Sequence, residues 1–388
     1  MNKLNHKHDN ANENERSEIG CVCKEVGVYR PCDKCAENHN DGGSETDDER
    51  FSGCAFVFDN GTGSEEVEKC IVIGKKTCKK DAKNNFKCHF CPSCDGYGCI
   101  GELPGMGGFN ENINFQKNCG GWNEIAKILV GENKLLQQDF ELLQTEADIS
   151  QLYAKYNLIS PIKRLGPMTG GVENVGYFDE RQFYFDLIDF SLKENLELSL
   201  GDGCPDEKLK FGIEAVKSQK IEEGKTFKKA AVFIKPYPNS KIFERIEWAS
   251  EVSEYIGVDI DSYNIVTMRN LVQLEKKNAS QLAEIRKKSN LPFVVKGIFT
   301  LEDIELVKEL KPEVAFVSNH GGRVENRIGS TAEFLYQYSN ELKNYCGEVW
   351  VDGGIRTKQD EFIASFLGVK QILLGRPVIS ALCEKQVN

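Results

Sequence analysis

The stretch that decides the fold is LPFVVKGIFTLEDIELVKELKPEVAFVSNHGGR, residues 291–323. Its runs at 292–298 and 314–319 are short and largely apolar, which is typical of strands that are buried on both faces. Between them, Thr300 is followed three residues later by Asp303 and then by apolar residues at helical spacing, which predicts a capped helix. A strand, a helix and a second strand in about 30 residues predict one unit of a parallel sheet.

The same alternation continues through the C-terminal part of the chain. Further helix starts are predicted at Asp179 and at Thr357. Eight units in about 220 residues predict an α/β fold, a TIM (β/α)8 barrel, although periodicity alone leaves an open doubly wound sheet as an alternative. The eight predicted strand runs are 161–168, 196–201, 230–236, 255–261, 292–298, 314–319, 348–354 and 371–377.

Three regions are predicted along the chain. Residues 1–85 form a polar, Cys-rich N-terminal extension that we expect to be partly disordered, at 1–20 and 36–50. Residues 86–157 carry a cysteine motif, a glycine-rich connector that reaches Phe115, and a largely helical lead-in from Trp122 to Tyr156. Residues 158–388 form the barrel.

Composition narrows the possible partners and the compartment. The chain has 388 residues and a net charge of −11, with no basic stripe, so we expect neither nucleic acid nor a membrane as a partner. Its polar start lacks the apolar core of a signal peptide, and no apolar run approaches the roughly 20 residues of a membrane span. We therefore expect a cytoplasmic protein.

Cysteines are concentrated near the N-terminus, where 12 of the 15 lie between residues 21 and 119. In a reducing compartment this favours metal or redox chemistry over a disulfide framework. A C-x2-C-x2-C-x4-C pattern could bind zinc or an iron–sulfur cluster, with zinc favoured because no proline follows the last cysteine. The alternative is a set of reduced or redox-reactive thiols. The four residues of this pattern are Cys88, Cys91, Cys94 and Cys99, and a second set is Cys21, Cys23, Cys32 and Cys35.

Glycine and arginine follow the last two predicted strands. The segment DGGIR (352–356) contains Arg356, and GRP (375–377) contains Arg376. In TIM barrels a phosphate often binds after strands 7 and 8, where glycines let backbone amides approach it. We therefore predict a cofactor phosphate site here, the alternative being two ordinary turns with surface arginines.

Residues that carry proton-transfer chemistry follow strands four to six. His320 follows the sixth run directly and is suited to take a proton from a substrate hydroxyl, while Arg323 is suited to bind a carboxylate. Asp259 and Asp261 end the fourth run, and either could orient the histidine. Lys296 ends the fifth run and could stabilise negative charge on a reduced flavin, or simply extend to the rim of the barrel.

Four segments together resemble the FMN-dependent 2-hydroxy acid oxidases and dehydrogenases, such as the glycolate and lactate oxidases. They are LPFVVKGIFTLEDIELV, VSNHGGR, VWVDGGIRTKQD and ILLGRPV, in the family's order over residues 291–378. The segments PIKRLGPMTGG, LSLGDG and GVDID resemble the family's first, second and fourth strands. The block CPSCDGYGCIGELPGMGG resembles a cysteine-bearing bacterial branch.

The resemblance implies FMN-dependent oxidation of a small 2-hydroxy acid, as in L-lactate oxidase. His320 would be the base, partnered by Asp261, while flavin N5 accepts the hydride and oxygen or another acceptor takes the electrons. Arg323 and Arg269 would bind the substrate carboxylate, and the protein would be a homo-oligomer. The implied FMN-binding residues are Pro167, Met168, Thr169, Ser199, Lys235, Lys296, Ser318, Asp352, Gly353, Gly354, Arg356, Gly375 and Arg376.

The substrate side departs from the family pattern. No tyrosine stands in a matching motif ahead of the barrel, and Lys235 and Pro236 stand in place of the usual glutamine-leucine-tyrosine motif after strand 3. Tyr237 is displaced by one step, and Arg269 is one residue too far from Asp261.

Two other functions are open from the sequence. One is a non-redox flavin barrel like type 2 isopentenyl diphosphate isomerase, although the NHGGR segment argues against it. The other is a metal-binding or redox-sensing protein whose barrel has lost catalysis.

Overall fold

The structure is a computed structural model in which two compact units are distinguished, Met1–Lys80 and Asp81–Asn388. It describes residues 21–22, 29–30, 54–59, 65–70, 113–145, 147–172, 177, 179–220, 226–265, 271–324 and 326–385. The predicted disorder, the four cysteines of the C-x2-C-x2-C-x4-C pattern and Arg269 lie outside these residues.

The described residues of the first unit form two antiparallel strand pairs. β1 (Cys21–Val22) pairs with β2 (Tyr29–Arg30). β3 (Cys54–Asp59) pairs with β4 (Glu65–Cys70) over the whole length of both strands.

The second unit is a closed barrel of eight parallel strands, in the order β5-β12-β11-β10-β9-β8-β7-β6. A parallel bridge between Arg164 and Glu197 joins the first strand to the second and closes the barrel, which excludes the open sheet. The predicted TIM barrel is confirmed, and every predicted run overlaps one strand, although β8 begins two residues before its predicted run. These strands are β5 (Ile162–Leu165), β6 (Leu198–Gly201), β7 (Ala230–Ile234), β8 (Ser253–Asp259), β9 (Phe293–Ile298), β10 (Val314–Val317), β11 (Glu348–Val351) and β12 (Gln371–Leu374).

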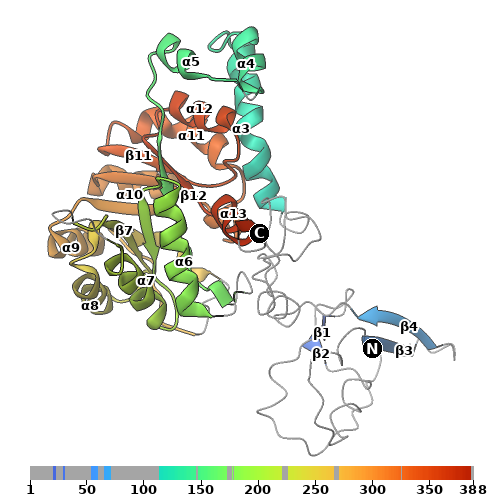
Figure 1. The fold of residues 1–388 in the computed structure, drawn as a ribbon, viewed down its shortest axis with the longest axis vertical. Coiled ribbons are helices and arrows are strands. Elements are labelled where there is room, and N and C mark those ends of the chain that lie inside the picture. The colour runs from blue at the N-terminus through green and yellow to red at the C-terminus, as the bar shows by residue number, and fades with distance from the viewer. Residues whose placement is uncertain are drawn as a thin grey trace, which may run out of the picture. The chain divides into compact units, whose positions relative to one another are not determined.

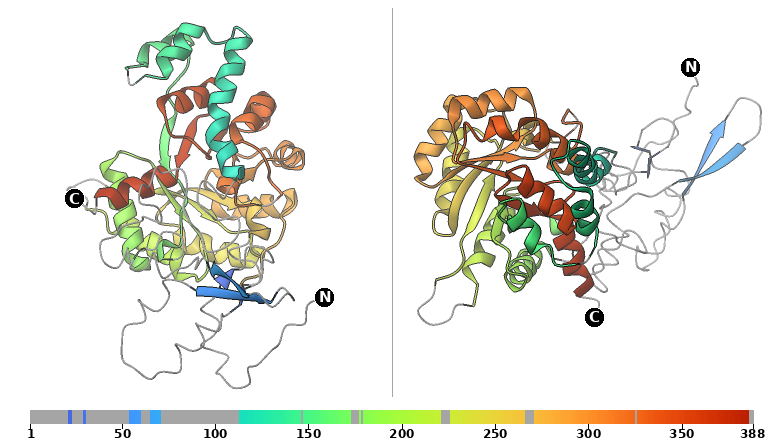
Figure 2. Two further views of the ribbon diagram at one scale, coloured as in Figure 1. Left: turned by 90° about the vertical axis from the view of Figure 1, so that its right-hand side faces the viewer. Right: turned by 90° about the horizontal axis from the view of Figure 1, so that it is seen from above.

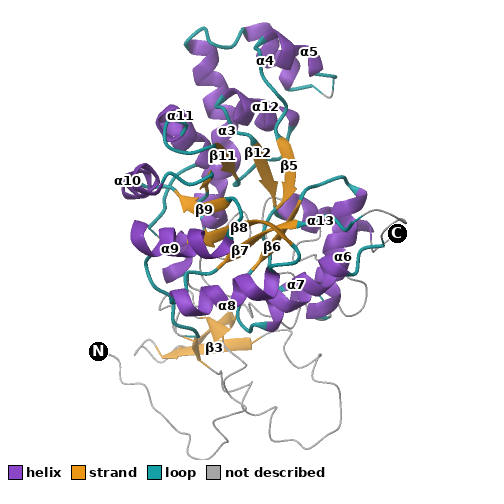
Figure 3. Cartoon of the chain, turned by 90° about the vertical axis from the view of Figure 1, so that its left-hand side faces the viewer, coloured by secondary structure: helices purple, strands orange, loops and turns teal. Residues whose placement is uncertain are grey.

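Helices surround the strands (Figure 3). Their predicted starts are confirmed: the side chains of Thr300 and Thr357 each accept a hydrogen bond from the backbone of the aspartate three residues later, which bonds back to form a capping box. Asp179 accepts from the backbone of Gln182 in the same way. The helices are α6 (Glu180–Lys193), α7 (Glu207–Lys217), α8 (Asn239–Ala249), α9 (Ala279–Ser289), α10 (Leu301–Leu310), α11 (Thr331–Leu342), α12 (Lys358–Phe366) and α13 (Arg376–Lys385).

Side chains fill the inside of the barrel, so it is a packed core and not a pore. Phe233, Phe316 and Trp350 are the large members of this cluster, with Tyr255 packed against Trp350. The guanidinium of Arg164 is buried beside them and lies 5.0 Å from the Trp350 ring centroid. A second, larger core lies between strands and helices. The packed interior of the barrel therefore supports the polar side chains at the carboxyl ends of the strands.

The lead-in comprises α3 (Ile113–Gly131), α4 (Gln137–Leu143) and α5 (Ser150–Lys155). α3 packs against α11 and α12, and α4 also contacts α12 (Figures 1 and 2). The prediction that the connector reaches Phe115 is wrong, because α3 already begins at Ile113. Phe115 is buried, and Asn114 bonds to the backbone of Arg327 and Gly329, so contacts with the barrel extend the helix. None of the described helices is long and apolar enough to span a membrane.

Candidate active site

The segment that contains His320 forms a left-handed turn directly after β10. Residues His320–Gly322 form the 3-10 turn η5, with φ of 59° at His320, 63° at Gly321 and 77° at Gly322. Glycine adopts this backbone freely, and histidine tolerates it better than most side chains. The two glycines therefore let the chain reverse at once, so that the histidine stays at the end of its strand.

Two hydrogen bonds hold this turn in place. Ser318 Oγ accepts from the backbone nitrogen of His320 at 3.1 Å, and Asn319 Oδ1 accepts from that of Gly322 at 3.1 Å. Asn319 in turn accepts from Asn118 Nδ2 of α3 at 2.7 Å. The lead-in helix therefore supports the turn that contains His320, which the sequence did not indicate.

Asp261 is the carboxylate that orients the histidine. It lies in η3 (Ile260–Asn264), directly after β8, and both of its oxygens lie 3.1 Å from Nδ1 of His320. Gly297 of β9 leaves room for this carboxylate, since a Cβ there would lie 2.7 Å from the Asp261 carboxyl carbon. The strand pattern left Asp259 and Asp261 as alternatives, the family resemblance implied Asp261, and the structure places Asp261 against Nδ1.

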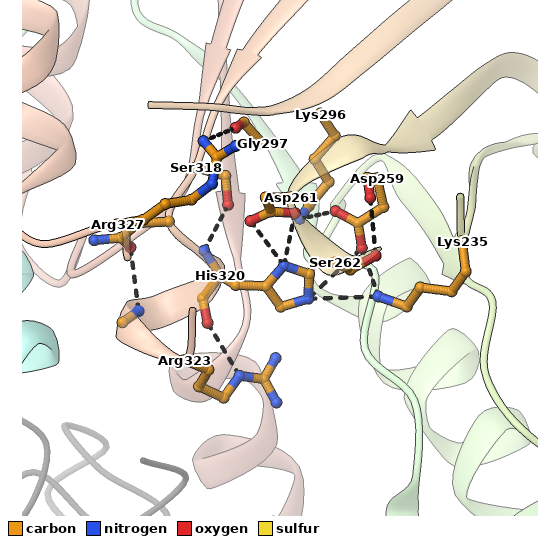
Figure 4. Close-up of polar contacts among 12 residues, drawn as sticks. Lys235, Asp259, Asp261, Ser262, Lys296, Gly297, Ser318, His320, Arg323 and Arg327 are labelled. Atoms are coloured by element: carbon orange, nitrogen blue, oxygen red, sulfur yellow. Dashed lines mark hydrogen bonds and ion pairs between the residues drawn. The ribbon is translucent and has the colours of Figure 1, made fainter. Parts of the chain in front are cut away.

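Asp259 instead binds two lysines (Figure 4). Lys296 Nζ donates to Oδ1 at 2.7 Å and Lys235 Nζ donates to Oδ2 at 2.6 Å. Burial opposes ionisation of Asp259, but His320 and the two lysines hold its pKa well below the usual carboxyl range. Burial likewise opposes the charged form of Lys296, but Asp259 and neighbouring carboxylates raise its pKa. The lysine that was predicted to face a flavin is thus a charged member of this buried network.

The histidine itself is neutral near pH 7. Burial is the main cause that lowers the pKa of His320 from 6.5 to about 4, outweighing the opposite effect of Asp259. The ring is 8% exposed, at an end of the barrel where substrates bind in this fold. An unprotonated imidazole with a carboxylate on Nδ1 has the arrangement of a general base.

Arg323 lies beside the histidine, one turn further along the chain. Its Nε donates to the backbone oxygen of His320 at 3.0 Å (Figure 4). Tyr237, by contrast, is only 1% exposed, and its ring stacks on the guanidinium of Arg245 at 4.3 Å. Tyr237 is thus part of a buried cluster, which its position in the sequence did not indicate.

The three residues Asp259, Asp261 and His320 offer ligand atoms within 4.8 Å of one another, a spacing that a metal ion could use. Both oxygens of Asp259 already face lysine ammonium groups, which repel a cation. The arrangement therefore fits an ion-pair network better than a metal centre.

The arginines predicted to hold a phosphate lie on one aromatic ring. The guanidinium carbons of Arg376 and Arg356 lie 3.5 Å and 5.5 Å from the Phe115 ring centroid. Two cationic groups gathered at the end of β11 and β12 suit a phosphate dianion. Phe115 lies seven residues before Trp122, so its apolar spacing could have predicted that it shares the buried face of α3.

The two glycines of the DGG segment, Gly353 and Gly354, are required because neighbouring atoms leave no room for a Cβ. A Cβ on Gly354 (φ 79°) would lie 2.2 Å from the backbone oxygen of Asn118, and one on Gly353 (φ 98°) 2.8 Å from Thr331 Oγ1. Trp122 Nε1 also donates to the oxygen of Gly353 at 2.8 Å. The DGG segment is therefore fixed between α3 and α11.

Polar atoms at the predicted FMN site suit a bound cofactor. Ser199 Oγ and Asp352 Oδ1 are buried and form no hydrogen bond with the described residues. Burial raises the pKa of Asp352 to about 6. A buried polar atom that lacks a partner costs free energy, which a ligand that supplies hydrogen bonds offsets. The segment Pro167–Thr169 lies against β6 and the residue that follows β12, because a Cβ on Gly201 would lie 2.6 Å from the Pro167 oxygen and one on Gly375 3.5 Å from Met168 Sδ. These residues fit FMN.

Comparison with known families agrees with this site. Residues 209–387 match the family model of FMN-dependent dehydrogenases. This stretch includes the His320 turn and both phosphate-site arginines. The resemblance predicted from the sequence is therefore confirmed for this part of the chain.

Individual relatives match over shorter stretches. 2-Hydroxyacid oxidase 2 of Rattus norvegicus is 36% identical over 106 residues, which are 27% of this chain and 30% of the relative. 2-Hydroxyacid oxidase 2 of Homo sapiens is 39% identical over 97 residues, 25% of this chain and 27% of the relative. 4-Hydroxymandelate oxidase of Amycolatopsis orientalis is 39% identical over 98 residues, 25% of this chain and 28% of the relative. The chain spans less than a third of the length of these curated relatives.

Among solved structures, mandelate oxidase with (S)-2-phenylpropionate matches with a TM-score of 0.49 and 16% identity. The match covers 82% of this chain and 89% of that chain.

Proposed function

We propose that this protein binds FMN at the carboxyl end of its barrel and oxidises a small 2-hydroxy acid to the 2-oxo acid. The observation that carries the proposal is the buried, neutral His320, held through Nδ1 by Asp261 at 3.1 Å beside Arg323. The match of residues 209–387 to FMN-dependent dehydrogenases supports the cofactor.

The residues of the chain divide the work among them. Arg323 binds the substrate carboxylate, and Nε2 of His320 takes the proton of the 2-hydroxyl group. Asp261 then stabilises the imidazolium that forms, since its carboxylate faces Nδ1. Bound FMN supplies the two-electron acceptor, and Lys296 provides positive charge near it.

Cofactor binding uses the rest of the predicted site. Arg356 and Arg376 bind the phosphate of FMN. Ser199 and Asp352 form hydrogen bonds with the rest of the cofactor. The other predicted contacts come from Pro167, Met168, Thr169, Lys235, Ser318, Gly353, Gly354 and Gly375. The family's pre-barrel tyrosine is missing, so the particular 2-hydroxy acid stays open, with L-lactate as the first to test.

The test is the visible spectrum of the purified protein under anaerobic conditions, before and after adding L-lactate. We expect flavin bands that bleach on addition, and that reappear with oxygen or an artificial acceptor. His320→Asn is expected to keep the flavin bands and to lower the rate of bleaching by at least about a hundredfold, the scale of general-base catalysis. The wild type and His320→Asn must both retain FMN for the comparison to hold.

Flavin bands that do not bleach with L-lactate, glycolate or mandelate would contradict the proposal and favour non-redox chemistry like that of type 2 isopentenyl diphosphate isomerase. Protein that binds no FMN even on reconstitution would contradict it entirely.

The N-terminal cysteines support a separate proposal from their spacing alone. We propose that Cys88, Cys91, Cys94 and Cys99 bind zinc, or else an iron–sulfur cluster that carries electrons from FMN to an acceptor other than oxygen. Elemental analysis distinguishes the two metals, and metal-free protein with full activity would contradict both. A cytoplasmic homo-oligomer is likewise proposed on the resemblance and composition, and sedimentation measures its subunit number.

A further inference from the structure

Lys235 occupies a position that the family pattern gives to glutamine, and the structure places it against the histidine. It follows β7, which neighbours β8 in the barrel, and its backbone nitrogen donates to Asp202 Oδ2 at 3.3 Å. The residue is 8% exposed. Its Nζ lies 2.6 Å from Asp259 Oδ2 and 3.5 Å from Nε2 of His320 (Figure 4).

The partners of His320 decide which ring nitrogen carries the proton. A carboxylate only accepts hydrogen bonds, so the two Asp261 oxygens at 3.1 Å require the proton to be on Nδ1. Nε2 faces two groups, Lys235 Nζ at 3.5 Å and Asp259 Oδ2 at 3.6 Å. That carboxylate oxygen already accepts from Lys235 at 2.6 Å, and an ammonium group only donates, so this side favours a lone pair on Nε2. The two neighbours thus select the same form of the neutral ring, the form in which Nε2 can act as a base.

We propose that Lys235 is a positioning residue of the catalytic centre, which donates a hydrogen bond to Nε2 of His320 and so keeps that nitrogen unprotonated until substrate binds. The catalytic part of this inference rests on the proposed function. The hydrogen bond itself does not, because it is a property of the chain without substrate.

The charges around the ring show why this lysine matters. Asp259 and Asp261 carry two negative charges, and Lys235 and Lys296 carry two positive ones. Removing Lys235 leaves an excess of negative charge close to the ring, which favours the imidazolium form. The described groups that face His320 or its partners are Asp202 after β6, Lys235 after β7, Asp259 on β8, Asp261 in η3, Lys296 on β9, Asp352 after β11, and Arg323 and Arg327 in the loop after η5.

During turnover Lys235 gives up its hydrogen bond to His320 but keeps its ion pair with Asp259. When substrate approaches, its hydroxyl group replaces the ammonium group as the hydrogen-bond donor to Nε2. The proton of that hydroxyl moves to Nε2, while the Lys235 ammonium keeps its bond to Asp259. Lys235 therefore keeps Nε2 of His320 unprotonated in the absence of substrate, and still allows the substrate hydroxyl group to reach it.

The experiment is a pH titration of the full-length chain labelled in its histidines and followed by nuclear magnetic resonance. The chain has five histidines, and the signal that disappears in His320→Asn is assigned to residue 320. In the wild type we expect a ring protonated on Nδ1 that titrates well below pH 6.5. In Lys235→Met we expect the midpoint to rise by about one pH unit or more, since a nearby charge shifts a buried pKa on that scale.

Two variants serve as controls. Lys235→Arg keeps the charge and should keep the low midpoint. Lys277→Met removes another buried lysine, one that binds Glu275 and Asn239, and should change nothing. Asp259 keeps Lys296 in Lys235→Met, so that variant retains a paired carboxylate. Lys235→Gln provides a second, polar replacement if the methionine variant does not fold.

A midpoint that is the same in Lys235→Met, Lys235→Gln and the wild type would overturn the inference. The acid limb of kcat/KM for flavin reduction gives a second readout and should move upward with the midpoint. An unmoved limb beside a moved midpoint would overturn the catalytic part of the inference alone. If no 2-hydroxy acid reduces the flavin, the proposed function fails, while the titration still decides whether Lys235 holds Nε2.

Discussion

At the scale of single residues, the site depends on small backbone features that place charged groups within hydrogen-bond distance. Gly297 shows this best. With φ of 103° and Asp261 in the space where a Cβ would be, it can be replaced by no other residue without strain. The glycine in VVKG thus serves the carboxylate that orients the histidine.

Gly297→Ala should therefore displace Asp261 from His320. We expect the rate of flavin reduction to fall by at least about tenfold and the free energy of unfolding to fall by about 1–3 kcal/mol, the cost of a strained backbone. Stopped-flow absorbance and urea denaturation measure the two effects. Gly120→Ala is the control, because a Cβ at that helical position meets no atom within 4 Å and should be neutral or slightly stabilising. Equal rates in both variants would refute this role of Gly297.

At the scale of elements, the lead-in helix α3 is part of the site. Asn118 is fully buried; its Nδ2 donates to Asn319 and its Oδ1 accepts from the backbone nitrogen of Thr331 at 3.0 Å. On the same helix, Phe115 lies against the phosphate-site arginines. α3 thus connects the histidine turn with the predicted phosphate site.

Asn118→Ala should leave the backbone nitrogen of Thr331 buried without a partner. We expect the free energy of unfolding to fall by about 2 kcal/mol or more, since a buried unsatisfied donor costs its full desolvation. Asn123→Ala makes the same change on the same helix, where the side chain is half-buried and accepts from Gln359 at 3.1 Å. That variant should lose less than about 1 kcal/mol. Chemical denaturation of both variants checks this, and equal losses would show that Asn118 has no special part.

At the scale of the whole molecule, the buried histidine couples stability to pH. The pKa of His320 is about 4 in the folded protein, compared with 6.5 for the free side chain. The unfolded chain therefore binds a proton on His320 between these values, whereas the folded chain does not. The free energy of unfolding is therefore unaffected by the protonation of His320 above about pH 6.5, and it decreases as the pH falls towards 4.

The measurable consequence is a difference between the wild type and His320→Asn. As the pH falls from 6.5 to 4, the free energy of unfolding of the wild type should drop by up to about 3 kcal/mol relative to the variant. Asp202 and Asp352, whose pKa values burial raises to about 6, act in the opposite direction, but they are present in both proteins. Denaturation curves at several pH values test this. Parallel curves would mean that the folded protein binds a proton on His320 as readily as the unfolded chain.

The sequence by itself determined the barrel, because its strands and capped helices are encoded locally. Apolar runs of six to eight residues and side chains such as Thr300 that cap helices need no distant partner to be recognised. It also determined which residues lie at the carboxyl ends of the strands, since in a parallel barrel these ends share one face. That was enough to predict His320, Lys296 and the two phosphate-site arginines as candidates.

Only the tertiary structure decided how those residues pair. Asp259 and Asp261 are two positions apart, and apart from the family resemblance, which implied Asp261, no local pattern shows which one lies against Nδ1 of the histidine. The choice depends on where the chain turns after β8 and on the space that Gly297 leaves on β9. The contact of Lys235 with His320 and the contact of Phe115 with Arg376 likewise join segments that are far apart in the sequence. Such contacts are fixed by the packing of the folded chain, which no local pattern encodes.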